Sequence, residues 1–296
     1  MANLKEVRNR ITSVQSTQQI TKAMKMVAAA KLRKAQDNII QMRPYSELLG
    51  NILNNLSAST SDDDLRSGFT VEREPKNVLI VVITSDRGLC GAFNSNIIKS
   101  ATALAQEKYA SQLSSGTVKF MGIGRKGFEA LSKRGYNTIK DYVEIFQNLS
   151  FGKAKEAGEY ILNAFKNQEI DRVELVYNEF KNVATQIIRV QQFLPISANQ
   201  ETENTSSTNQ DYILEPSKEE IIEELIPKTL KIQLYKAILE SNASEHGARM
   251  TAMDKATDNA NELLKELKLT YNRSRQAAIT KEILEIVGGA EALKAE

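Results

Sequence analysis

The glycine-rich segment Gly122-Ile-Gly124-Arg-Lys-Gly127 is the strongest candidate for a cofactor site in the sequence. It fits the pattern G-x-G-x-x-G, in which glycines let the backbone approach a pyrophosphate at a helix N-terminus, and Asp141 lies near the distance expected for a ribose contact. The pattern follows the second predicted strand of its domain, however, and the bulky Arg125 and Lys126 stand in the turn. We therefore favour glycines for a tight strand–helix turn, and keep an NAD(P)-linked enzyme as the alternative.

The segment Ser85–Asn94 contains the single cysteine, Cys90, next to Gly91 at a predicted helix start. A helix N-terminus lowers the pKa of a thiol, so an activated thiolate is one interpretation of Cys90. The only histidine, His246, is predicted in the C-terminal helix, and the sequence contains no G-x-x-x-x-G-K-[ST] phosphate loop. We favour a buried structural thiol for Cys90 and a solvated position for His246, and expect no catalytic residue, cofactor or metal ion.

The N-terminal segment carries a run of basic side chains. On an isolated helix a solvated face is the favoured interpretation, and contact with an acidic partner loop is the alternative. Polar side chains of the C-terminal segment would supply matching contact points. The basic residues are Lys22, Lys25, Lys31, Arg33 and Lys34, and the C-terminal ones are Arg249, Arg273, Arg275 and Gln276.

The composition favours extended helices over one compact core. Of 296 residues, 41% are hydrophobic, only 6% are aromatic, and tryptophan is absent, whereas large aromatic side chains usually fill a core. Lys plus Arg (39) nearly balances Asp plus Glu (37), which argues against a nucleic-acid-binding protein. The longest apolar run, Val78–Ile83, is too short to cross a bilayer, and the first residues show no export signal.

Both ends of the chain are predicted to be long helices, over residues 1–57 and 216–296. Near the N-terminus, apolar residues three and four positions apart have the spacing of a coiled-coil seam. The seam loses its apolar character at Gln18 and Thr21, where Ile20, Met24 and Val27 form a rotated stripe. Neither helix is expected to bury its stripe on a small middle domain, so we expect the two to pair antiparallel, with Val14 within about a turn of Ala260. The seam residues are Leu4, Val7, Ile11 and Val14, then Ala28, Leu32, Ala35, Ile39 and Met42.

Between the helices, residues 76–196 are predicted to form a small α/β domain. The buried strands Val78–Thr84 and Thr117–Ile123 are followed by helical stretches, and Arg172–Tyr177 with Val183–Phe193 reads as a hairpin. Strands alternating with helices indicate a mostly parallel sheet. The predicted fold class is α/β: a long antiparallel coiled coil of the N- and C-terminal helices plus a central Rossmann-like, mostly parallel α/β domain. The polar segment Ser197–Gln210 is predicted to be a loop.

Four segments, in the same order as in the family, carry a specific resemblance to the gamma subunit of bacterial F-type ATP synthases. They span the whole chain, and His246-Gly247 and Ala92-Phe93 are departures that leave the resemblance intact. The segments are Ile20-Thr-Lys-Ala-Met-Lys-Met-Val-Ala-Ala-Ala-Lys-Leu-Arg-Lys-Ala35, Ser85-Asp-Arg-Gly-Leu-Cys-Gly91, Ala243-Ser-Glu-His-Gly-Ala-Arg-Met-Thr-Ala-Met253 and Tyr271-Asn-Arg-Ser-Arg-Gln-Ala-Ala-Ile-Thr-Lys-Glu282.

The resemblance implies a noncatalytic rotor in the central stalk, turned by a membrane ring of c subunits and coupling proton flow to ATP synthesis. It implies alpha, beta and epsilon subunits as further partners, and a peripheral position on the cytoplasmic face of the cell membrane. By position, Met24 and Lys25 match the zone facing acidic loops of beta, and Arg249, Gln276 and Thr280 match polar contacts with the alpha/beta ring. The matching bearing tip consists of Ile279, Ile283, Ile286 and Val287.

Overall fold

The computed structural model describes residues 4–58, 68–183, 185–196 and 218–294 and divides into two compact units. The helix-pair unit comprises the described residues up to Ala28 and from Met250 onward, and the sheet unit comprises those from Ala29 to Arg249. Two long helices, α1 (Leu4–Ala58) and α6 (Lys218–Lys294), each contribute to both units. Neither these helices nor any other described helix is long and apolar enough to cross a membrane.

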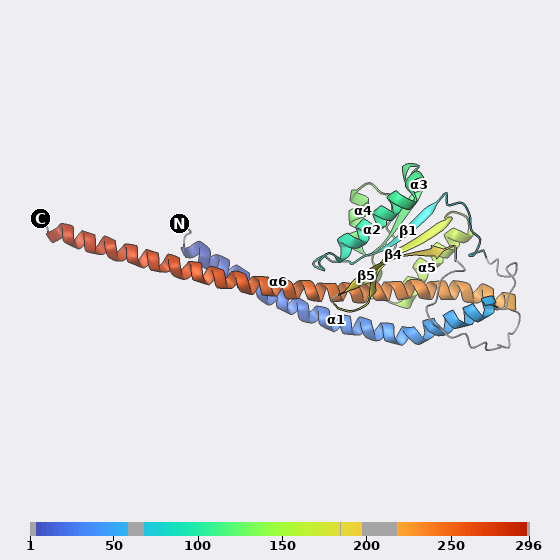
Figure 1. Ribbon diagram of the computed structural model, residues 1–296, viewed down its shortest axis with the longest axis horizontal. Coiled ribbons are helices and arrows are strands. Elements are labelled where there is room, and N and C mark those ends of the chain that lie inside the picture. Colours follow the sequence, from blue (N-terminus) through green and yellow to red (C-terminus); the bar gives the residue numbers. More distant parts are fainter. Residues whose placement is uncertain (1–3, 59–67, 184, 197–217, 295–296) are drawn as a thin grey trace. The chain divides into compact units, whose positions relative to one another are not determined.

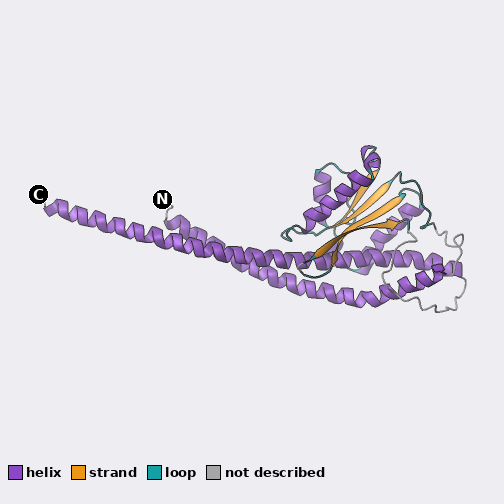
Figure 2. Ribbon diagram, viewed as in Figure 1, coloured by secondary structure: helices purple, strands orange, loops and turns teal. Residues whose placement is uncertain are grey.

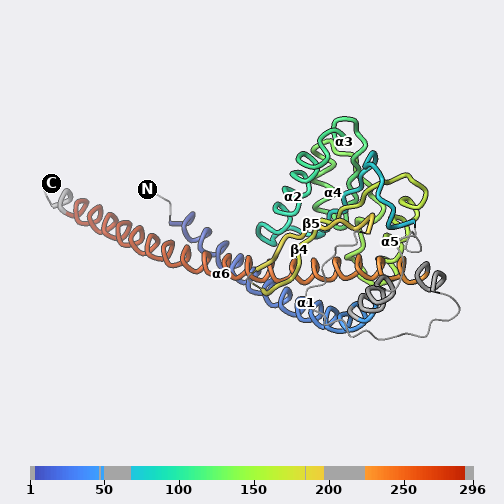
Figure 3. The backbone as a smooth tube through the Cα atoms, turned by 45° about the vertical axis from the view of Figure 1, so that its right-hand side comes forward, coloured from blue at the N-terminus to red at the C-terminus, as the bar shows by residue number. Residues whose placement is uncertain are grey.

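In the helix-pair unit, α1 and α6 run antiparallel and side by side (Figures 1 and 3). Gln18 hydrogen-bonds Asn261, Thr21 pairs with Thr257, and Lys25 pairs with Asp254, so positions rise along α1 as they fall along α6. Some seam residues are buried and others, such as Ile11 and Val14, are partly buried, whereas Ile20 and Val27 of the predicted rotated stripe are exposed. The buried seam residues are Val7, Thr21, Ala28, Met253, Ala260 and Leu264.

The sheet unit is built on a five-stranded sheet of order β3-β2-β1-β4-β5 (Figure 2). β1, β2, β3 and β4 are parallel, and β5 is antiparallel to β4 at the edge. The central strand β1 is buried on both faces, which explains its continuous apolar sequence. The strands are β1 (Val78–Ile83), β2 (Val118–Ile123), β3 (Thr138–Ile139), β4 (Arg172–Phe180) and β5 (Gln186–Leu194).

Helices cover both faces of this sheet (Figure 1). α2 (Phe93–Lys108) and α4 (Arg125–Lys133) pack on one face, against alternate β1 residues such as Ile80. α5 (Phe151–Lys166) packs on the other, together with the Ile226–Ile238 part of α6. The short α3 (Ala110–Ser114) and a 3₁₀ helix, η1 (Ile145–Asn148), complete the unit.

The predicted fold class is confirmed, and one expectation about burial is corrected. α6 does bury a stripe on the sheet, because Leu234 and Ile238 lie fully buried in the core beneath the strands. Further along α6, Ala243 packs against Leu32 and Ala35 of α1, so the same helix serves the sheet and the helix pair. The predicted polar loop Ser197–Gln210 lies outside the described residues.

Candidate partner-contact site

Lys25 and Met24 lie on α1 in the helix-pair unit, in a partly exposed environment. The Lys25 Nζ is 2.5 Å from Asp254 Oδ1, and the two side chains are 39% and 49% exposed. Met24 is half-buried, and the nearby apolar side chains of Ile20, Met26 and Val27 are exposed. This surface combines an ion pair open to solvent with apolar area, as is common in protein–protein contacts.

Polar residues continue the seam where its apolar character stops. The Gln18 amide bonds the Asn261 side chain, and the Thr21 and Thr257 hydroxyls lie 2.8 Å apart. With Lys25–Asp254 they form three successive polar layers at heptad spacing. Sliding one helix past the other would break all three pairs at once, so these layers fix the register.

The predicted polar contacts near the C-terminus are exposed. Gln276 and Thr280 are exposed side chains of α6, and the bearing-tip residues are between 48% and 71% exposed. Counting equal steps along both helices from the Gln18–Asn261 pair puts Leu4 level with Arg275. The segment of α6 beyond Arg275 therefore extends past the first described residue of α1. The tip residues are Ile279, Ile283, Ile286 and Val287.

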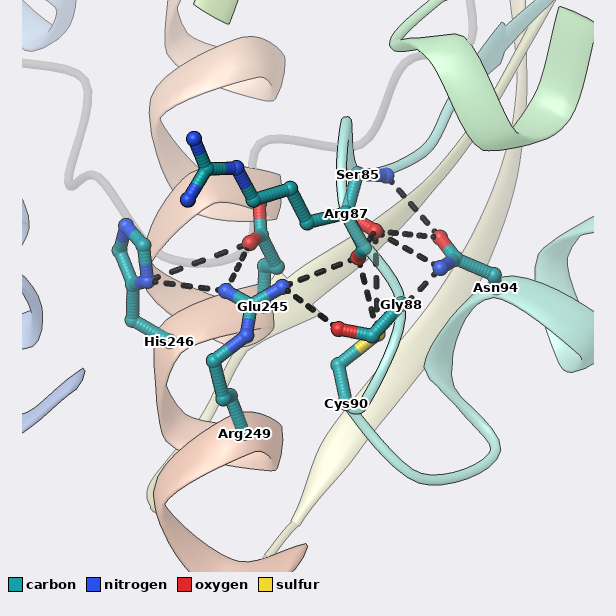
Figure 4. Close-up of polar contacts among 8 residues, drawn as sticks. All are labelled: Ser85, Arg87, Gly88, Cys90, Asn94, Glu245, His246 and Arg249. Atoms are coloured by element: carbon teal, nitrogen blue, oxygen red, sulfur yellow. Dashed lines mark hydrogen bonds and ion pairs between the residues drawn. The ribbon is translucent and has the colours of Figure 1, made fainter. Parts of the chain in front are cut away.

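Arg249 lies in the sheet unit and bonds within the chain (Figure 4). Its Nη2 donates to the carbonyl oxygens of Arg87 (3.0 Å) and Gly88 (3.3 Å). Its Nη1 pairs with the Glu245 carboxylate and lies 3.4 Å from His246 Nδ1. The guanidinium therefore joins α6 to the loop between β1 and α2, and the Arg249 side chain is only 12% exposed.

The same loop encloses Cys90 in hydrogen bonds (Figure 4). Asn94 Nδ2 donates to Cys90 Sγ at 3.3 Å and to Ser85 Oγ at 2.7 Å, and Ser85 Oγ donates to the Arg87 carbonyl. Burial raises the pKa of the Cys90 thiol, which favours the structural role over an activated thiolate.

His246 of α6 is buried, whereas the sequence predicted a solvated position. Burial, together with the nearby positive charges of Arg249 and Lys31, lowers the pKa of His246 to about 4.

The glycine segment Gly122–Gly127 accommodates a neighbouring strand end. A Cβ on Gly124, whose φ is +101°, would lie 2.1 Å from the Thr84 carbonyl oxygen, and one on Gly127 would lie 2.7 Å from Thr84 Oγ1. The α4 N-terminal amides of Arg125, Lys126 and Gly127 donate to Asp86, Ser85 and Thr84. The groups that would hold a pyrophosphate thus bind the chain itself, which supports the tight-turn interpretation.

The structure brings Lys25 and Met24 together on α1, and Gln276, Thr280 and the tip together on α6. Sequence reasoning missed their partners inside the chain, namely Asp254, Thr257 and Asn261, and the loop carbonyls that bind Arg249. Heptad spacing continued through Gln18, Thr21 and Lys25 would have placed these three α1 residues on the seam, but would not have identified their α6 partners. Within the described residues no group of three or more His, Cys, Asp or Glu side chains could hold a metal ion.

The chain is similar to known proteins along almost its whole length. It matches the family described as ATP synthase over residues 3–293. Proteins named ATP synthase gamma chain from Cytophaga hutchinsonii and Flavobacterium psychrophilum are 64% and 58% identical over 294 residues, covering 99% of this chain and 99% and 100% of those chains.

Solved structures show a similar fold. A chain from the central stalk and c-ring of Tetrahymena thermophila mitochondrial ATP synthase aligns with a TM-score of 0.58 and 26% identity, over 80% of this chain and 99% of that one. A chain from Euglena gracilis mitochondrial ATP synthase aligns with a TM-score of 0.67 and 22% identity, over 99% and 95%. By its sequence over nearly its full length, the chain belongs to the ATP synthase gamma chain family.

Proposed function

We propose that the chain is the central-stalk rotor subunit of a proton-translocating F-type ATP synthase. It transmits rotation of a membrane c-ring to catalytic beta subunits and so couples proton flow to ATP synthesis. The observation that carries this proposal is the 64% identity, over 99% of both chains, to a protein named ATP synthase gamma chain.

The helix-pair unit has properties that a rotating shaft requires. Three polar layers, formed by Gln18, Thr21 and Lys25 with their α6 partners, resist sliding of one helix along the other. Ile20, Met26 and Val27 leave apolar side chains on α1 open to solvent. A pair of two different helices has no rotational symmetry, so it presents a different surface to each of several surrounding subunits. An asymmetric, non-slipping pair converts rotation into sequential contacts.

We assign the contact roles by residue. Lys25 with Met24 faces acidic loops of beta, and Arg249, Gln276 and Thr280 supply polar contacts to the alpha/beta ring. The apolar tip turns inside a sleeve of that ring, because its side chains are exposed and no described residue of α1 lies level with them. The tip residues are Ile279, Ile283, Ile286 and Val287.

In this proposal the subunit is noncatalytic and binds the membrane peripherally on its cytoplasmic face, through the c-ring and together with an epsilon subunit. The proposal keeps the domain division predicted from the sequence, with helical segments assigned to 1–57 and 216–296 and an α/β domain assigned to 76–196. In the complex the chain changes the conformation of the surrounding subunits, and nucleotide chemistry takes place on beta.

The test is isolation of the complex from membranes of cells expressing a tagged full-length chain. We expect alpha and beta subunits to co-purify in a three-to-three ratio with one copy of this chain, together with epsilon and c subunits. Purification of the chain without ATPase subunits, from membranes that contain them, would refute the proposal.

An NAD(P)-linked enzyme is the alternative class. Calorimetric titration of the purified chain with NAD⁺ and NADPH separates the two, because the amides of Arg125, Lys126 and Gly127 already donate to the chain's own oxygens. We expect no binding at micromolar concentrations. Micromolar affinity would favour the enzyme.

A further inference from the structure

We propose that Arg249 is a positioning residue that works inside the chain: it fastens the loop Ser85–Gly91 to α6, so that this loop follows rotation of the helix. The proposal rests on the proposed rotor function and adds an attachment between the sheet unit's loop and the shaft helix. It gives Arg249 a task that is independent of any contact with a surrounding ring.

The guanidinium is occupied by acceptors of the chain itself. Two loop carbonyls, those of Arg87 and Gly88, accept from one nitrogen, and the Glu245 carboxylate accepts from the other. Arg249 and Glu245 side chains are 12% and 8% exposed, so this charge-assisted network is largely removed from water. Only the planar fork of arginine can bind these acceptors together, since lysine presents a single point charge.

The loop has a conformation that needs support. Leu89 is a non-glycine residue with a φ of 66°, and Gly91 has a φ of 61°. Leu89 is also 65% exposed, so burial of its side chain contributes little to holding that conformation. Ser85 and Asn94 bind the loop to its own domain, and Arg249 binds it to α6.

The position of Arg249 along α6 determines which part of the helix its hydrogen bonds hold. Apolar packing of α6 under the sheet is concentrated in the Ile226–Ile238 part, whereas Arg249 lies three turns further along and is the last residue of the sheet unit. Apolar packing is non-directional, whereas hydrogen bonds from one guanidinium to two loop carbonyls tie the loop to one angle of the helix about its own axis. Arg249 therefore holds the loop where α6 continues into the helix-pair unit.

The test is hydrogen exchange on the full chain, isolated and in the assembled complex, comparing wild type, Arg249→Met and Arg249→Lys. The amides of Ser85 and Arg125 report on the loop, because the Ser85 amide donates to the Asn94 side chain and the Arg125 amide donates to the side chain of Asp86 within the loop. We expect at least tenfold faster exchange at these amides in Arg249→Met and a smaller increase in Arg249→Lys. Exchange at β1 and β4 should be unchanged. Lys255→Met, at an exposed position of α6 to which no contact is assigned, is the matched control.

Coupling is measured on the same complexes as proton pumping per ATP hydrolysed. We expect a several-fold loss in Arg249→Met. If loop exchange in the isolated chain is unchanged by both variants, the fastening does not exist. If exchange at the loop amides rises but proton pumping per ATP stays normal, the Arg249 hydrogen bonds to the loop have no part in coupling. Where Arg249→Met fails to fold, Arg249→Lys carries the comparison. If the proposed rotor function is wrong, the wild-type chain will form no ATPase complex, and this result is distinct from the two outcomes above.

Discussion

At the scale of single residues, the polar side chains expected to face partners also have partners within the chain. Lys25 pairs with Asp254 and Arg249 with Glu245, although both cations were expected to point toward a surrounding ring. The two pairs differ in burial: Lys25 remains 39% exposed, whereas Arg249 is 12% exposed. Exchanging an exposed pair for a contact with another partner costs little free energy, whereas breaking a buried pair costs more.

Charge reversal at Lys25 tests whether its charge acts on a partner. Lys25→Glu should lower ATP-coupled turnover of the assembled complex several-fold while changing the melting temperature of the chain by only a few degrees, since an exposed pair contributes about 0.2–1 kcal/mol. Turnover by reconstituted complexes and thermal unfolding of the chain are the measurements.

The matched control is the charge swap Lys25→Glu with Asp254→Lys, which restores an ion pair inside the chain but leaves the reversed charge at position 25. We expect stability to recover and turnover to stay low. Recovery of turnover in the swapped variant would show that the pair with Asp254, and not a partner contact, is what the complex needs.

Alanine substitutions at Gly124 and Gly135 distinguish the two reasons for a glycine: close approach of a neighbouring segment and a left-handed backbone conformation. Both have positive φ, but an added Cβ would meet Thr84 at Gly124 and nothing within 4 Å at Gly135. Gly135→Ala should cost about 1–2 kcal/mol of unfolding free energy, for the left-handed conformation alone. Gly124→Ala should cost roughly 1–3 kcal/mol more because the strand end must move. Equal losses in denaturant unfolding would contradict a packing role for Gly124.

At the scale of elements, the sequence predicts where helices and strands lie along the chain better than it predicts which elements they pack against. The apolar run Val78–Ile83 identifies a buried strand because each of its residues is apolar, and β1 has those bounds. Burial of α6 under the sheet was missed, because a helix with apolar residues such as Leu234 and Ala243 on several sides does not reveal which side meets a sheet and which a helix.

The pairing of α1 and α6 shows the same limit. The polar layers hold Gln18 opposite Asn261, so Val14 lies level with Lys265 and next to Leu264, about a turn beyond the expected Ala260. Apolar spacing fixes which face of each helix is buried, but many registers bury the same faces equally well. Specific polar pairs decide among them, and those pairs are visible only once the helices are placed.

A disulfide between α1 and α6 tests this register. In a Cys90→Ala background, the Val14→Cys/Leu264→Cys pair should oxidise readily, because a disulfide requires Cα atoms within about 7 Å. The control pair Val14→Cys/Met253→Cys, about three turns displaced, should not. Non-reducing electrophoresis of the isolated chain gives the result. Preferential formation of the control pair would show that the polar layers do not set the register.

At the scale of the whole molecule, each long helix contributes to two compact units, and each unit serves a different part of the proposed function. The helix-pair unit offers an exposed apolar stripe and tip, and the sheet unit offers a layered α/β body through which part of α6 runs. α6 is one helix from Lys218 to Lys294, and its proline, Pro227, which has no backbone N–H to donate, lies at the start of the sheet-bound part. A torque applied to α6 beyond Pro227 therefore reaches its tip through helical backbone hydrogen bonds.

A disulfide also tests whether the helix pair turns as one body. If α1 and α6 rotate together, the Val14–Leu264 disulfide should leave ATP hydrolysis and proton pumping of the assembled complex within about twofold of the reduced form, because it joins groups that keep a fixed distance. The polar layers at Gln18, Thr21 and Lys25 give the physical reason, since sliding or unwinding would separate all three pairs.

The control is a disulfide from an exposed α6 position near the tip, such as Thr280→Cys, to a cysteine in a surrounding subunit, which should stop turnover until it is reduced. A Val14–Leu264 disulfide that forms fully and halts turnover, with recovery on reduction, would mean that the two helices must move relative to each other during the cycle. Rigid rotation of the pair would then be wrong, although the register measured in the isolated chain would stand.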